Sequence, residues 1–261
     1  MIVLKSPREI ALMRAAGSIL AEAMERLRAL VKPGVSTLEI DRDVEEFIRG
    51  RGARPAFKGY RGFPATVCTS INEEVVHGIP RAHRRVKEGD IISLDLGCVV
   101  DGYYADCALT LALGEVPPRV QQLLDVTRQS LERAVAECRP SRRLGDVSHA
   151  VQSHVERHGF SVVRAFVGHG IGRDLHEEPQ VPNFGKPGTG PRLVPGMTIA
   201  IEPMVNAGRP EVRTLSDRWT VVTVDGSRSA HFEHTVAITE DGARILTLAE
   251  APVTAAKAWS S

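Results

Sequence analysis

The sequence lacks the features that mark several classes of protein. Its four cysteines include no Cys-x-x-Cys pair, so no disulfide framework is indicated and a reducing compartment is the simpler expectation. The formal net charge is only +1, so we expect neither DNA nor a membrane surface as a partner. No apolar run is long enough for a membrane span or a signal peptide. These absences predict a cytoplasmic protein.

What is present is an ordinary globular composition. The 261 residues are 43% hydrophobic and 25% charged, which suffices for a sizeable core in one large domain or two small ones. No linker or low-complexity tract divides the chain, and the proline- and glycine-rich run at 182–195 is typical of a surface loop. We therefore expect a single domain over residues 1–261. The modest charge and the lack of an apolar surface stripe favour a monomer.

The most informative stretch covers residues 90–106. Asp101-Gly102 predicts a two-residue type I′ turn, because both central positions of that turn need positive φ. With these two residues as the loop, Gly97 lies opposite Asp106, and Asp95 shares its face as a diagonal neighbour roughly 7–8 Å away. Two unpaired buried carboxylates at that distance are costly, whereas shared cations stabilise both. The hairpin therefore predicts a cation site.

Helices are expected around this hairpin. Capping boxes at Ser6-Pro7-Arg8-Glu9 and Ser36-Thr37-Leu38-Glu39 each open an amphipathic helix. A third amphipathic helix is expected at 118–138. The apolar stripe of the second helix recurs 107 residues later, which indicates internal duplication into two similar halves. The two stripes are Ile40, Val44, Ile48 and Gly52, then Val147, Val151, Val155 and Gly159.

The second half of the sequence favours strands. Residues 161–166 and 197–202 are expected to be extended, and residues 219–224 and 230–238 flank an Asp225-Gly226 turn. That turn predicts a second long hairpin. Antiparallel hairpins combined with amphipathic helices define an α+β fold, with the helices packed on the outer face of the sheet.

Three further residues are candidates to complete the cation site. Glu202 ends an otherwise apolar strand, and Glu233 lies among apolar neighbours in the second predicted hairpin. His169 stands between two glycines, which let the backbone approach a metal closely. Each alone is more simply explained as a solvent-facing glutamate or a turn histidine. Together with the two aspartates they form four carboxylates and one imidazole, a set typical of paired divalent ions that activate water.

These residues lie in motifs that resemble type I methionine aminopeptidases of peptidase family M24, in its short bacterial form. The resemblance covers nearly the whole chain, and the number and order of the motifs make it specific. It implies the pseudo-two-fold "pita-bread" fold. The motifs are NEEVVHGIP at 72–80, Asp95 and Asp106, GHGIG at 168–172, HEEP at 176–179, IEPM at 201–204 and FEHT at 232–235.

The resemblance implies a cofactor of two divalent metal ions, which the sequence leaves open between Co, Mn, Fe, Zn and Ni. It assigns Asp95, Asp106, His169, Glu202 and Glu233 as ligands, with Asp106 and Glu233 bridging the ions. It further implies that a hydroxide between the ions attacks the scissile amide, and that Glu202 passes a proton to the departing amine.

The same resemblance gives roles to two histidines and to a pocket. His176 would donate a hydrogen bond to the carbonyl oxygen as negative charge develops, and His77 would hydrogen-bond the scissile amide. Phe57 and Leu175 stand where relatives often have a cysteine and an aromatic residue, so pocket volume is expected to be redistributed. The residues that match the family's methionine pocket are Tyr60, Phe63, Cys68 and Trp219.

The implied substrate is the initiator methionine of a nascent chain, followed by a small residue. The ribosome near its exit tunnel is an implied partner, with residues 81–87 as the candidate contact. Two alternatives are open. A proline-directed peptidase shares the fold and ligands but normally carries an extra N-terminal domain, for which the stretch before His77 leaves no room. A non-enzymatic binding module of this fold would have lost the ligands, which are all present here.

Overall fold

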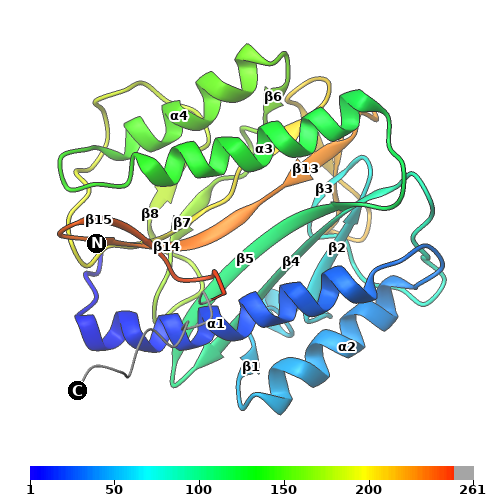
Figure 1. Ribbon diagram of the computed structural model, residues 1–261, viewed down its shortest axis with the longest axis horizontal. Helices are drawn as coiled ribbons and strands as arrows, with labels where there is room; N and C mark the ends of the chain where they lie inside the picture. The colour runs from blue at the N-terminus through cyan, green and yellow to red at the C-terminus, as the bar shows by residue number, and fades with distance from the viewer. Residues whose placement is uncertain (250–261) are drawn as a thin grey trace, which may run out of the picture.

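The hairpin of β4 (Ile91–Val100) and β5 (Tyr103–Ala112) forms the centre of the structure, a computed structural model that describes residues 1–249 (Figure 1). Its register pairs Gly97 with Asp106, as predicted from the sequence. Asp101-Gly102 has φ values of 49° and 80°, as a type I′ turn requires. The alignment of the two aspartates on one face is therefore confirmed.

Most strands join this hairpin in one antiparallel sheet. The other members are β1 (Arg54–Pro55), β2 (Val67–Ile71), β7 (Gly168–Gly170), β8 (Glu177–Val181), β9 (Thr198–Ile201), β14 (Glu233–Thr239) and β15 (Gly242–Ile245). Their order is β1-β4-β5-β14-β9-β7-β8, with β2 on β4 and β15 on β14. Strands β5 and β14 are far apart in the sequence, so their pairing joins the first half of the chain to the second.

Two three-stranded sheets flank the main one. Their orders are β13-β10-β6 and β11-β12-β3. Their members are β3 (Glu74–Val76), β6 (Ser161–Val162), β10 (Met204–Asn206), β11 (Val212–Thr214), β12 (Val221–Thr223) and β13 (Ser229–His231). The strand expected at 161–166 is thus only two residues long.

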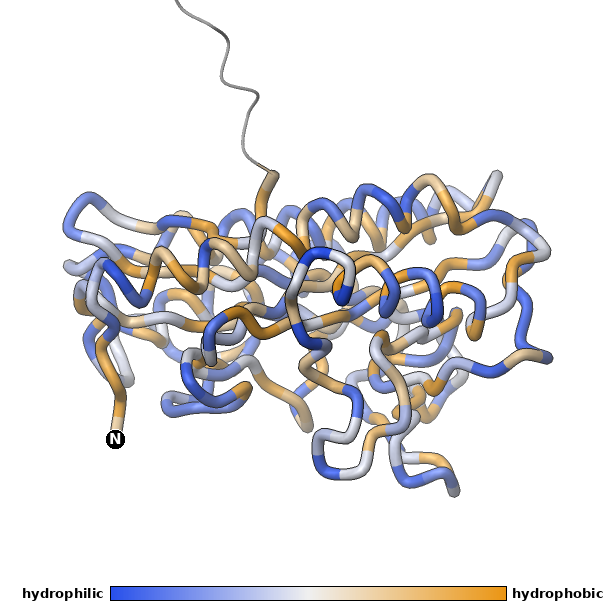
Figure 2. The backbone as a smooth tube through the Cα atoms, turned by 90° about the horizontal axis from the view of Figure 1, so that it is seen from below, coloured by the Kyte–Doolittle hydropathy of each residue, from blue (hydrophilic) through white to orange (hydrophobic). Residues whose placement is uncertain are grey.

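Four α-helices and one short 3₁₀ turn complete the described part of the chain. They are α1 (Pro7–Leu30), α2 (Thr37–Gly50), α3 (Pro118–Ala136), α4 (Leu144–Arg157) and η1 (Tyr60–Gly62). The α-helices lie along one side of the molecule and loops project from the other (Figures 1 and 2). The capping boxes predicted at Ser6 and Ser36 are both present. No helix within residues 1–249 is long and apolar enough to cross a membrane.

The 107-residue repeat coincides with two matching helices. Helices α2 and α4 both have 14 residues and begin at Thr37 and Leu144. The glycines that follow them, Gly52 and Gly159, have nearly the same left-handed φ, 74° and 70°. These correspondences support two similar halves, and the duplication itself stays a prediction.

The second long hairpin is a wrong prediction. Strand β12 pairs with β3 and β11, β13 pairs with β10, and β14 pairs with β5, β9 and β15. Asp225 accepts hydrogen bonds from the backbone N–H groups of Ser227 (3.0 Å) and Arg209 (2.7 Å). The bond from Ser227 closes a local Asx turn, and the bond from Arg209 ties this turn to the segment after β10. The two segments on either side of the turn pair with other strands and not with each other.

Candidate metal centre

The two hairpin aspartates face away from the helices. Leu94 and Leu96, on either side of Asp95, are fully buried in one cluster with Leu20 of α1. Because side chains alternate along a strand, Asp95 points to the opposite face. Both aspartates are buried there, Asp95 at 8% and Asp106 at 4% exposure.

Strands from the second half of the chain bring the other predicted ligands to this face. Asp106, His169 and Glu233 are buried and offer ligand atoms that all lie within 4.8 Å of one another. His169 Nε2 lies 3.9 Å from Asp106 Oδ2 and 3.6 Å from Glu202 Oε1. These gaps are too long for good hydrogen bonds and suit atoms that each approach an ion to about 2 Å. Asp95 contacts Asp106, so all five predicted ligands are brought together.

Several carboxylate oxygens of this cluster lack hydrogen-bond partners. Asp95 Oδ1, Asp106 Oδ1 and Glu233 Oε1 are buried without a hydrogen bond. Burial raises the pKa of Asp95 to about 7. Burial first, and neighbouring carboxylates second, raise the pKa values of Asp106, Glu202 and Glu233 well above their usual range. Orphaned oxygens with this donor set fit divalent first-row cations, which would stabilise the ionised forms.

His169 is held in the form that a metal ligand needs. Its Nδ1–H donates to the carbonyl of Gly170 at 2.9 Å, so a neutral ring presents the Nε2 lone pair to the carboxylates. Burial, and then the charge of His176, lowers the pKa of His169 to about 3. The ring is therefore neutral at pH 7 and free to coordinate.

Removing metal is expected to leave a protein whose stability falls as the pH rises from about 6.5 to 8. In this window the folded state retains protons on carboxyls with raised pKa values, whereas the unfolded chain, with carboxyl pKa values of about 4, has lost them. Buried histidines, whose folded-state pKa values are lowered, oppose this trend only weakly. Histidines of the unfolded chain, with pKa values of about 6.5, have already lost about half of their protons at the start of this window. The Tm of metal-stripped protein at pH 6.5 and at pH 8 measures this dependence of stability on pH.

Metal addition provides the control for that measurement. Ions bind only the deprotonated ligands, so Mn²⁺ is expected to raise the Tm more at pH 8 than at pH 6.5. A Tm of stripped protein that does not change between the two pH values would show that the cluster ionises freely without metal.

A cavity of about 160 Å³ opens over the cluster. All five predicted ligands line it, and so do His77, His176 and the predicted methionine-pocket residues Tyr60, Phe63, Cys68 and Trp219. Phe63 meets Trp219 edge to face at 5.1 Å. Phe57 and Leu175, the two departures from the family pattern, also belong to the lining. The apolar part of the cavity thus adjoins the carboxylates directly.

Two histidines stand over the cluster in restrained orientations. His176 stacks on Tyr60 with ring centroids 5.4 Å apart, and its Nδ1 lies 2.9 Å from the Tyr60 hydroxyl. His77 has a left-handed φ of 61°, a strained conformation that is typical of functional sites. Burial lowers the pKa of His77 to about 4, and the pKa of His176 is also lowered, mainly by burial. Both rings are neutral at pH 7.

Sequence reasoning gave no site role to His231 or Asn183. Both ring nitrogens of His231 are buried without a hydrogen bond, and its Nε2 lies 3.9 Å from Glu202 Oε2. Asn183 donates to the carbonyl of Glu202 at 2.9 Å. The signal for His231 was its spacing of two residues from Glu233, which suggests a shared face. His234 instead hydrogen-bonds Thr247 at 2.9 Å.

The four cysteines are all buried thiols. Burial, and then the negative charge of Asp95, raises the pKa of Cys68 well above its ordinary value. Burial and Asp106 do the same to Cys107. These thiols stay protonated near the cluster, so they act as polarisable apolar groups and not as ligands.

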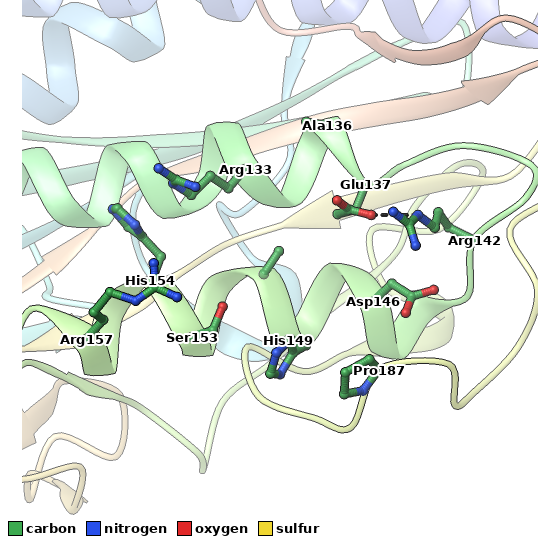
Figure 3. A pocket seen from close by; sticks show the side chains of 11 residues that line it. Arg133, Ala136, Glu137, Arg142, Asp146, His149, Ser153, His154, Arg157 and Pro187 are labelled. Atoms are coloured by element: carbon green, nitrogen blue, oxygen red, sulfur yellow. Dashed lines mark ion pairs between the residues drawn. The ribbon is translucent and has the colours of Figure 1, made fainter.

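A larger cavity, about 410 Å³, lies between α3 and α4 (Figure 3). Its carboxylates already have partners. Glu137 pairs with Arg142 at 2.8 Å, and Asp146 accepts from the backbone N–H groups of Arg143 and Gly188, both at 2.8 Å. This groove therefore offers no set of free oxygens like that of the metal-ligand cluster.

The curled sheet with its buried oxygen-rich cluster defines a metallohydrolase, and a family model confirms the class. Residues 11–240 match metallopeptidase family M24, and the chain belongs to that family. Relatives that it matches over nearly their full length are named methionine aminopeptidases, as the sequence motifs predicted. Methionine aminopeptidase 1 of Bacillus subtilis is 55% identical, and the match covers 95% of this chain and 99% of that relative. The methionine aminopeptidase of Clostridium acetobutylicum is 52% identical, and the match covers 96% of this chain and 100% of that relative.

Solved structures agree with the pita-bread prediction. Methionine aminopeptidase from Thermotoga maritima superposes with a TM-score of 0.94 at 51% identity, covering 95% of this chain and 100% of that one. Prolidase from Pyrococcus furiosus shares the fold with a TM-score of 0.74 at 23% identity, and this chain covers 66% of it. The α+β fold with a pita-bread sheet is therefore confirmed.

Proposed function

We propose that the protein removes N-terminal methionine from newly made chains in which a small residue follows. The observation that carries the proposal is a single cavity shared by the five predicted ligands and an apolar, sulfur-containing pocket. A thioether suits such a lining. The names of the full-length relatives support the same activity.

Asp95, Asp106, His169, Glu202 and Glu233 would hold two divalent ions. When bound, such a pair supplies a nucleophile at neutral pH and polarises the attacked carbonyl. The protein's own part is to fix these ligands in a buried site and to move protons. Glu202 lines the cavity beside the other ligands, so its carboxylate is placed to take a proton and return it to the departing amine.

The two histidines would stabilise charge on the reacting amide. His176 would donate from Nε2 to the carbonyl oxygen. A neutral ring can do this only if Nδ1 accepts, and the Tyr60 hydroxyl at 2.9 Å is placed to donate to Nδ1. His77, packed edge-on against Trp219 at 6.1 Å, would hydrogen-bond the scissile nitrogen.

Hydrolysis of matched peptides tests the proposal. Metal-stripped protein is expected to release free methionine from Met-Ala-Ser only after Mn, Fe, Co, Ni or Zn is restored, and to leave Ala-Pro-Ser intact. Comparing the metals ranks the ions. Cleavage of Ala-Pro-Ser instead would move the protein to the prolidases, with Phe57 and Leu175 as the first residues to exchange.

The proposed substrate also sets where the protein acts. Initiator methionine is exposed as chains leave the ribosome, so the proposal includes a cytoplasmic monomer that works near the exit tunnel. Within the basic segment 81–87, Arg84 pairs with Glu74 at 2.8 Å, and Arg85 donates to the carbonyl of Gly34 at 2.7 Å. These two arginines serve the fold, which leaves Arg81 and Lys87 as the residues of this segment to test for ribosome contact.

A further inference from the structure

The two halves of the main sheet meet at a narrow seam. Strands β5 and β14 pair at only two positions, Glu233 with Ala108 and His234 with Cys107. By contrast, β4 and β5 pair along ten positions. This seam nevertheless carries a proposed metal ligand on each side, Asp106 from β5 and Glu233 from β14.

Where the backbone pairing of β5 and β14 ends, a threonine hydroxyl continues the hydrogen bonding between the strands. At the next position the backbone N–H of Asp106 donates to Thr235 Oγ1 at 2.9 Å, and this hydroxyl donates back to the carbonyl of Asp106 at 2.8 Å. Thr235 is fully buried. Its own backbone is engaged elsewhere, because its carbonyl accepts from Leu246 N at 2.8 Å and its N–H donates to Thr247 Oγ1 at 3.3 Å.

Beyond the other end of the seam, β5 makes the same kind of hydroxyl bridge to His231, the last residue of β13. Thr110 of β5 donates through Oγ1 to the carbonyl of His231 at 2.9 Å and accepts from the His231 N–H at 2.9 Å. The two backbone pairings are thus flanked by two hydroxyl bridges. One of these bridges fixes the backbone of Asp106 on both of its polar groups.

We propose that Thr235 is a positioning residue that sets the separation of Asp106 and Glu233 across the seam, and thereby the affinity for the metal pair. The inference rests on the proposed metal role of these two carboxylates. Without the hydroxyl, a buried N–H and a buried carbonyl of Asp106 lose their partner, and β5 can satisfy them only by moving. Loss of a partner that orients a metal ligand typically costs about 10–100-fold in affinity.

The test compares Mn²⁺ binding by calorimetry in three variants of the full chain. Thr235→Val keeps the side-chain shape and removes the hydroxyl, and Thr235→Ser keeps the hydroxyl. Thr127→Val is the matched control, because Thr127 is equally buried and its hydroxyl donates only to the carbonyl of Leu123 within α3, at 2.7 Å. The Tm of each metal-free variant separates metal affinity from folding.

Thr235→Val is expected to weaken Mn²⁺ binding by about 10–100-fold, while Thr235→Ser and Thr127→Val bind as the wild type does. The inference would be overturned if Thr235→Val bound Mn²⁺ with wild-type affinity. It would also be overturned if Thr235→Ser and Thr127→Val lost as much Mn²⁺ affinity as Thr235→Val. A wild type that binds no Mn²⁺, Co²⁺ or Zn²⁺ would instead overturn the proposed function on which it rests. If Thr235→Val does not fold, Thr235→Cys, with its weak S–H donor, is expected to bind more weakly than Thr235→Ser, and equal binding by the two would contradict the inference.

Discussion

Replacing Asp106 with asparagine is expected to lower kcat/KM for Met-Ala-Ser by about 10⁴-fold, equivalent to roughly 5.5 kcal/mol of transition-state stabilisation. Asp106 is a proposed metal ligand that lies beside both Asp95 and His169. A neutral amide keeps the volume of the carboxylate but cannot supply anionic oxygens to a divalent cation. Steady-state kinetics at saturating Mn²⁺, with metal content measured on the same sample, gives the result.

The same variant distinguishes lost chemistry from lost folding. Asp106→Asn removes a buried carboxyl whose pKa is raised by burial, so its metal-free form is expected to be at least as stable at pH 8 as metal-free wild type. Asp146→Asn is the matched control, since Asp146 accepts from the backbone N–H of Arg143 at the start of α4, outside the metal cluster. This change is expected to cost at most about 1 kcal/mol of stability with full activity. Retention of activity within tenfold in Asp106→Asn would rule out the proposed role of Asp106 as a metal ligand.

Replacing His176 with alanine is expected to lower kcat by about 10²–10³-fold, the usual loss when a donor to a developing oxyanion is removed. The donor acts on the transition state, so KM is expected to change much less than kcat. Tyr60→Phe is expected to show a smaller loss in the same direction, because the tautomer of His176 is then no longer held by the hydroxyl 2.9 Å away.

His149 supplies the control for the histidine series. It is an exposed residue of α4, and His149→Ala is expected to leave kcat and KM unchanged. If His176→Ala raises KM instead and spares kcat, the ring binds substrate without stabilising charge, and the proposed oxyanion role fails.

The parts of the fold and site that the sequence predicted are those fixed by local chemistry or by motif order. The Asp101-Gly102 turn sets the register of its own strands, so the face shared by Asp95 and Asp106 followed from the sequence. The capping serines likewise mark their own helices. Bringing His169 and Glu233 to that face needed the family motifs, because no short-range rule links β5 to strands more than fifty residues away.

The features that the sequence did not predict also depend on contacts between distant segments. An alternating strand states which face is apolar but not which strand it pairs with, so residues 219–224 and 230–238 were joined in a hairpin that does not form. Nothing in the sequence indicated a role for Thr235 either. A β-branched residue in a strand is ordinary, and only the structure shows its hydroxyl replacing the ladder beside Asp106.

The burial of the four thiols also determines how the folded protein meets electrophiles and oxidants. Alkylation and peroxide oxidation both need a thiolate that solvent can reach, and burial raises the pKa values of Cys98 and Cys138 to about 12. Cys68 and Cys107 are further protected by neighbouring carboxylates. Cys98 and Cys138 are fully buried, so their reaction must wait for the core to open, and the rate at which these two cysteines are labelled reports the rate of unfolding.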